Sequence, residues 1–115
     1  MYQYRQQQSI FAEQNARGED KMFLYDMTQF PGKNPKLRTF ANVQLKPGEE
    51  VGFHIHTGEF ESYYIISGTG VYNDNGEEIE ALPGLVTFTP SGTGHGIRNT
   101  GSEMLEFIAL IVSDE

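Results

Sequence analysis

The sequence has no cysteine and no tryptophan, and it contains few basic residues and only three histidines. Without cysteine, neither a disulfide nor a thiolate-bound metal can form, so any metal must be held by nitrogen and oxygen. Eight lysines and arginines stand against 16 acidic residues, which gives a net charge of −8. Such a charge repels phosphate backbones and anionic lipids, so we expect no nucleic-acid partner and no membrane partner.

Long apolar runs are also absent. No stretch approaches the ~20 apolar residues that a membrane helix needs. The N-terminal segment MYQYRQQQSIFAEQNARGED has no apolar region of the kind found in signal peptides. We therefore expect a soluble protein in the cytoplasm, and the length of 115 residues fits a single domain covering residues 1–115.

What the sequence does contain is glycine, with 13 residues spread between short apolar runs. This pattern is typical of many short strands joined by tight turns, and Asn75-Gly76 between two extended runs indicates a hairpin. The number and spacing of the runs predict an all-β barrel or sandwich. The expected strands are residues 22–27, 39–45, 51–56, 61–67, 69–73, 77–82, 85–89, 95–99 and 104–112.

The first part of the chain is more polar than the rest. We expect about residues 1–36 to form an N-terminal arm with the first strand, and residues 37–112 to form the barrel. A barrel of this kind leaves sheet edges, which the arm and the last strand could cover in a dimer. The predicted partners are therefore a small-molecule ligand and a second copy of the chain.

The histidines are placed where they could share a ligand. His54 and His56 alternate within one expected strand, so both imidazoles point to the same face while Ile55 points to an apolar layer on the other. Glu61 follows a bend, and we expect it on the next antiparallel strand, facing the histidines. His95 comes from a distant strand, which only a closed or sandwiched sheet would bring to the same point. Alternatively, each histidine is an ordinary core residue with satisfied hydrogen bonds.

A first spaced motif surrounds the two neighbouring histidines. It reads glycine, five residues, histidine, one residue, histidine, four residues, glutamate, six residues, glycine. Its fixed positions are Gly48, His54, His56, Glu61 and Gly68.

A second motif surrounds the third histidine. It reads glycine, five residues, proline, one residue, glycine, two residues, histidine, three residues, asparagine, and its fixed positions are Gly84, Pro90, Gly92, His95 and Asn99. Together the two motifs resemble those of the cupin superfamily, in a small single-domain form. Two positions depart from the common cupin pattern: Leu85 stands where Asp is usual, and Gly94 where Pro often precedes the histidine.

The resemblance implies a jelly-roll β-barrel with a metal held by the three histidines and Glu61. This ligand set suits one divalent ion of Mn, Fe, Ni, Zn, Co or Cu, and it leaves two octahedral positions open. The implied function is to act on, or bind, a small carboxylate, enolate or sugar-like molecule, as an isomerase, lyase or dioxygenase. The alternatives are a non-catalytic, metal-dependent binding or sensor module, and a metal that only stabilises the barrel.

Strand alternation assigns the neighbouring side chains. Tyr63 shares the face of Glu61, where it is either a catalytic hydrogen-bond donor or proton relay, or an aromatic wall residue. Ile97 is expected in the pocket wall and Arg98 at the surface. Glu59 is expected to be solvated, or at best a hydrogen-bond partner of a metal ligand.

Overall fold

The computed structural model describes residues 1–2, 4, 9–14, 20–26 and 30–115, and for 9–14 and 20–26 it describes the backbone. Within these residues there are nine strands and no helix, which confirms the all-β prediction. The strands are β1 (Ser9–Gln14), β2 (Asp20–Asp26), β3 (Leu37–Leu45), β4 (Glu50–Ile55), β5 (Glu59–Ser67), β6 (Gly70–Asp74), β7 (Glu77–Ala81), β8 (Gly94–Asn99) and β9 (Leu105–Ser113).

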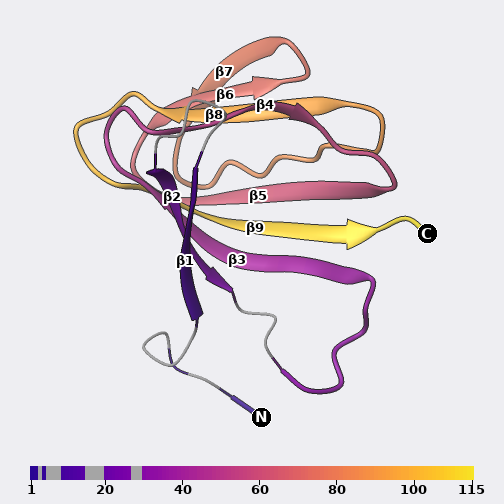
Figure 1. The fold of residues 1–115 in the computed structure, drawn as a ribbon. Helices are drawn as coiled ribbons and strands as arrows, with labels where there is room; N and C mark the ends of the chain where they lie inside the picture. Colours follow the sequence, from indigo (N-terminus) through magenta and orange to yellow (C-terminus); the bar gives the residue numbers. More distant parts are fainter. Residues whose placement is uncertain (3, 5–8, 15–19, 27–29) are drawn as a thin grey trace.

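The strands form two antiparallel sheets stacked as layers (Figure 1). The five-stranded sheet has the order β1-β2-β3-β9-β5, and the four-stranded sheet has the order β4-β8-β6-β7. The last strand, β9, lies between β3 and β5, so the expectation that it covers a sheet edge is wrong. The edges of the larger sheet are β1 and β5.

The core lies between the sheets, because alternate residues of each strand are apolar and point inward. In β3, Ala41, Val43 and Leu45 are buried, as their alternation predicts. In β9, opposite Ala41 and Val43, Ala109 and Phe107 are buried as well. Buried side chains of β3 and β9 therefore stand in register across the two neighbouring strands.

The predicted hairpin is present between β6 and β7. Asp74 pairs with Glu77, which leaves a two-residue turn at Asn75 and Gly76. Both turn residues have positive φ, 50° and 104°, and asparagine and glycine tolerate this conformation best. The sequence Asn75-Gly76 alone predicts the hairpin correctly, because the conformation of a two-residue turn depends on its own backbone rather than on distant contacts.

The segment 85–89, expected as a strand, is not one. It lies beside the edge strand β5 through two isolated bridges, Glu61↔Thr89 and Tyr64↔Val86. Backbone hydrogen bonds join residues 84–89 to β5, but the amide of Tyr63 donates to the hydroxyl of Thr87 instead of to a carbonyl, which interrupts the ladder.

The N-terminal arm takes part in the larger sheet. β2 pairs with β3 and β1 pairs with β2. The expected first strand, residues 22–27, falls within Asp20–Asp26 except for residue 27, which lies outside the described residues. β1 was not expected from the sequence, because residues 9–14 show no clear alternation of apolar and polar residues.

Candidate metal centre

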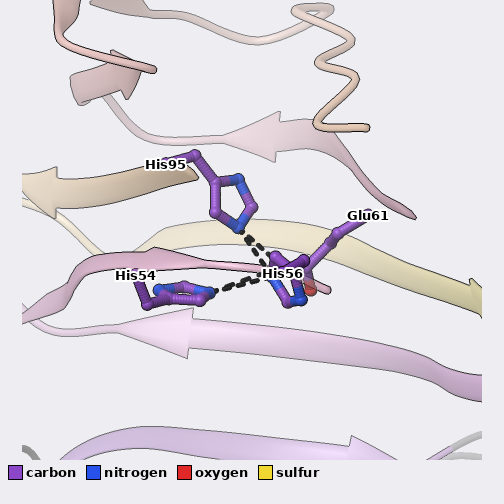
Figure 2. A group of neighbouring side chains, drawn as sticks. All are labelled: His54, His56, Glu61 and His95. Atoms are coloured by element: carbon purple, nitrogen blue, oxygen red, sulfur yellow. Dashed lines mark hydrogen bonds and ion pairs between the residues drawn. The ribbon is translucent and has the colours of Figure 1, made fainter. Parts of the chain in front are cut away.

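The four predicted metal ligands come together between the two sheets (Figure 2). His54 lies in β4, and His56 follows the last residue of that strand. His95 lies in β8 directly across from His54. Glu61 lies in β5, on the inner face of the opposite sheet.

The route by which Glu61 reaches the cluster differs from the expected one. We expected β5 to pair with β4, but β4 pairs with β8 and β5 pairs with β9. After His56 the chain turns at Gly58, which has a φ of 76°, and crosses from one sheet to the other. Glu61 therefore faces the histidines across the interior rather than from a neighbouring strand.

The ligand atoms converge on one point. Oε1 of Glu61 lies 2.7 Å from Nε2 of His95, 2.8 Å from Nε2 of His56 and 3.8 Å from Nε2 of His54. Nε2 of His56 lies 3.0 Å from that of His54 and 3.3 Å from that of His95. Two ligands bound at about 2.1 Å and at right angles lie about 3 Å apart. These spacings, and the nitrogen and oxygen donors, are compatible with a transition-metal ion.

Two of the histidines use their other ring nitrogen for a contact outside the cluster. Nδ1 of His54 lies 2.8 Å from the carbonyl oxygen of Gly52. Nδ1 of His56 lies 2.7 Å from Oε2 of Glu59. The other carboxylate oxygen of Glu59, Oε1, accepts a hydrogen bond of 2.6 Å from Arg38. Acceptors at Nδ1 fix the proton there and leave the Nε2 lone pair free for a metal.

The third histidine is held by hydroxyl groups. Nδ1 of His95 lies 2.9 Å from Oη of Tyr72 and 3.1 Å from Oγ1 of Thr89, and all three side chains are buried. The two hydroxyls are themselves 3.0 Å apart. Sequence reasoning missed Tyr72 and Thr89, because neither lies in a motif position that indicates contact with His95.

Electrostatics favour charged carboxylates in the cluster. Burial alone would raise the pKa of Glu61, but hydrogen bonds from His54 and His95 and the nearby imidazole charge outweigh it and lower the pKa from 4.5 to about 2. Burial would also raise the pKa of Glu59, and the hydrogen bonds from Arg38 and His56 lower it on balance. Glu61 is therefore an anion at neutral pH, as a metal ligand must be.

A cavity of about 290 Å³ lies against the cluster. Tyr63 lines it, as strand alternation predicted, and its ring stacks on that of His95 with a centroid distance of 4.8 Å and an interplanar angle of 27°. Arg98 is exposed, as predicted, and Ile97 is buried but does not line this cavity as expected. Ile55, expected to face an apolar layer, is 62% exposed. The lining residues are Thr39, Val43, Val51, His54, His56, Glu61, Tyr63, Phe107, Ala109 and Ile111.

Fold and site together define a double-sheet β-sandwich with a histidine–carboxylate cluster inside. The family model for the cupin domain matches residues 41–111, more than half of the chain. The chain therefore belongs to the cupin domain family, and the jelly-roll prediction is confirmed. No helix long and apolar enough to cross a membrane occurs in the described part of the chain.

Individual relatives agree with this assignment. An oxalate-binding protein of Thermotoga maritima is 52% identical over 77 residues, which are 67% of this chain and 64% of that protein. The tetracenomycin polyketide synthase protein TcmJ of Streptomyces glaucescens is 34% identical over 62 residues, 54% of this chain and 42% of that protein. The matches thus span less than two thirds of each of these two relatives.

A solved structure matches over almost the whole chain. It is a crystal structure from Thermotoga maritima described as a predicted oxalate decarboxylase, with a TM-score of 0.89 and 38% sequence identity. The match covers 98% of this chain and 99% of that one. The arrangement of both sheets, with the N-terminal strands included, is therefore shared with a protein of nearly the same length.

Proposed function

We propose that the chain binds one divalent transition-metal ion through His54, His56, Glu61 and His95. We further propose that a small carboxylate ligand chelates this ion. One observation carries the proposal: four ligand atoms lie within 4.8 Å of one another beside a cavity. When bound, the ion would supply Lewis acidity and charge for ligand oxygens. The name of the oxalate-binding relative supports a small carboxylate as the ligand.

Binding without turnover is the role that the cavity favours. Apart from the four proposed ligands, the lining residues with exchangeable protons are Thr39 and Tyr63, both with hydroxyl groups. An isomerase, lyase or dioxygenase activity is the second candidate, and in that case the Tyr63 hydroxyl would be the proton donor or relay. A bound carboxylate recovered unchanged after long incubation would favour the binding role, and its conversion would favour an enzyme.

Elemental analysis of the protein, purified without a metal-affinity tag, tests the metal site. We expect about one transition-metal ion per chain in the native protein and none in a His54→Ala/His95→Ala variant. The Glu80→Gln variant, which removes an exposed carboxylate of β7, should keep the metal. Equal metal content in the native protein and the double variant would contradict the proposal, and so would an empty native protein after metal has been supplied.

We also propose that two copies of the chain associate. Large apolar side chains are exposed along the sheet edge formed by β5 and segment 85–89: Tyr64, Val86 and Phe88 are 50%, 65% and 59% exposed. The rings of Phe60 and Phe88 lie 5.2 Å apart in the same surface. We call these four residues the apolar edge surface. A second copy would remove it from water, and an identical patch on each partner suits a symmetric dimer.

A further inference from the structure

We infer that the cavity beside the metal centre selects chelating acids with a short apolar tail, such as branched 2-oxo acids, over acids whose tail ends in a second carboxylate. The inference rests on the proposed metal site and names the ligand class for it. Oxalate, for which one relative is named, consists of two carboxylates and has no tail.

The floor of the cavity starts at the metal cluster and continues across the larger sheet. Ile111 of β9 lies directly across from Glu61 of β5, and Thr39 of β3 lies on its other side. The next inward-facing residue of β9 is Ala109, which has Tyr63 across from it in β5. A ligand held at Glu61 therefore has apolar side chains beside it in the direction of β9.

Space for a tail comes from a small residue in the middle of this floor. Ala109 lies between the larger side chains of Ile111 and Phe107 along β9, and Val51 of β4 lines the same cavity. The volume of about 290 Å³ is close to the lower end of the ~300–1,000 Å³ typical of small-molecule pockets. Two carboxylates bound to an ion would fill only part of it.

The part of the cavity wall that the structure describes carries no cationic side chain to neutralise a second anion. Among the described residues that line the cavity there is no lysine and no arginine. Arg38 of β3 does not line the cavity, and its guanidinium is held by Glu59 and Ser113. A carboxylate placed at the far end of the cavity would lose its hydration without gaining an opposite charge. An apolar tail would instead gain about fourfold in affinity for each methylene that it buries.

A series of acids with the same chelating head tests this selectivity. The protein is loaded with Co²⁺, whose visible spectrum reports a change in coordination, and titrated with pyruvate, 4-methyl-2-oxopentanoate, 2-oxoglutarate and oxalate. We expect 4-methyl-2-oxopentanoate to bind at least tenfold more tightly than pyruvate, and 2-oxoglutarate to bind no more tightly than pyruvate. Equal affinities for the three 2-oxo acids, or a preference for 2-oxoglutarate, would overturn the inference.

A second experiment fills the cavity with a larger side chain. In an Ala109→Leu variant the preference for 4-methyl-2-oxopentanoate over pyruvate should fall below threefold. The Ser62→Leu variant adds the same bulk on the opposite face of the neighbouring strand and should keep the full preference. If Ala109→Leu does not fold, Ile111→Ala replaces it, and enlargement of the cavity should then shift the preference toward the bulkier phenylpyruvate. An unchanged preference in the folded variant would count against the inference.

The two proposals fail in different ways. If Co²⁺ does not bind, or if no acid, oxalate included, changes its spectrum, then the proposed function fails and the selectivity with it. If pyruvate and oxalate change the spectrum but the tail has no effect, the metal-chelate function stands and only the ligand class is wrong.

Discussion

At the scale of single residues, each histidine of the cluster is oriented by a different kind of hydrogen-bonding group. Gly52 provides a backbone carbonyl, Glu59 a carboxylate, and Tyr72 and Thr89 provide two hydroxyls. A carboxylate partner makes an imidazole more basic, whereas hydroxyls mainly fix its direction. The hydroxyl pair should therefore affect metal affinity through the position of His95.

The Tyr72→Phe/Thr89→Val variant tests this positioning role. Without either hydroxyl, the buried Nδ1–H of His95 has no acceptor, and we expect metal affinity to fall by about 10–100-fold. Competition with a coloured chelator measures the affinity. The Tyr64→Phe variant removes an exposed hydroxyl from the same class of side chain and should behave as the native protein. An affinity within twofold of native in the double variant would contradict the role.

Glu61 gives a pH dependence to the metal-free protein. Its pKa is lowered from 4.5 to about 2 on folding, so the carboxylate stabilises the fold above pH 4.5 and loses that contribution as the pH falls from 4.5 to about 2. The contribution at neutral pH should be on the order of a few kcal/mol. Urea unfolding of the native and Glu61→Gln proteins at a series of pH values measures it. The difference between them should shrink across this window, and a constant difference would show that Glu61 is not the cause.

The ligands could be predicted from the sequence, whereas the groups that orient them could not. His54, His56, Glu61 and His95 stand at fixed spacings in two motifs that resemble those of a known family. Tyr72 meets His95 because β6 pairs with β8, and sequence spacing does not determine this pairing.

At the scale of elements, the turn from β5 to β6 depends on close backbone packing. Gly68 has a φ of 85°, and a Cβ placed there would lie 2.8 Å from Cα of Leu105 and would clash with the carbonyl of Met104. Both the conformation and the space therefore require glycine. The start of β9 is held at a distance from this turn that only glycine allows.

We expect the Gly68→Ala variant to lose more than about 1 kcal/mol of folding free energy, because the native conformation is incompatible with a side chain. Thermal or urea unfolding measures the loss. Gly52→Ala is the matched control, since nothing lies within 4 Å of a Cβ there and its φ is not positive. Equal stability of the two variants would mean that the turn can shift to make room.

Most strands could be predicted because alternation and turn residues are local signals. Three predictions at this scale were wrong for non-local reasons, and one of them is the placement of β9 at a sheet edge. The bend after His56 is short enough for a hairpin, yet it leads to the other sheet. Segment 85–89 has the composition of a strand, but its ladder with β5 is interrupted where the hydroxyl of Thr87 accepts the hydrogen bond of the Tyr63 amide, which leaves two isolated bridges.

At the scale of the whole molecule, the apolar edge surface makes a prediction about association. A Val86→Lys/Phe88→Lys variant places charge in the surface and should sediment as a monomer where the native protein sediments as a dimer. The Met104→Lys variant changes another exposed apolar residue, outside that surface, and should remain dimeric. A native monomer at micromolar concentration would remove the proposal. The sequence predicts a second copy of the chain as a partner, but the surface itself could not be predicted, because exposure depends on how the sheets stack.

The ligand set draws on both sheets: the three histidines belong to the strands β4 and β8 or the residue after β4, and Glu61 belongs to β5. An ion held by all four would join the two layers at one point. Any motion that separates the layers would then have to release a ligand. Amide hydrogen exchange should accordingly slow in both sheets together when the metal binds. The affinity for the metal then measures how strongly separation of the two sheets is opposed.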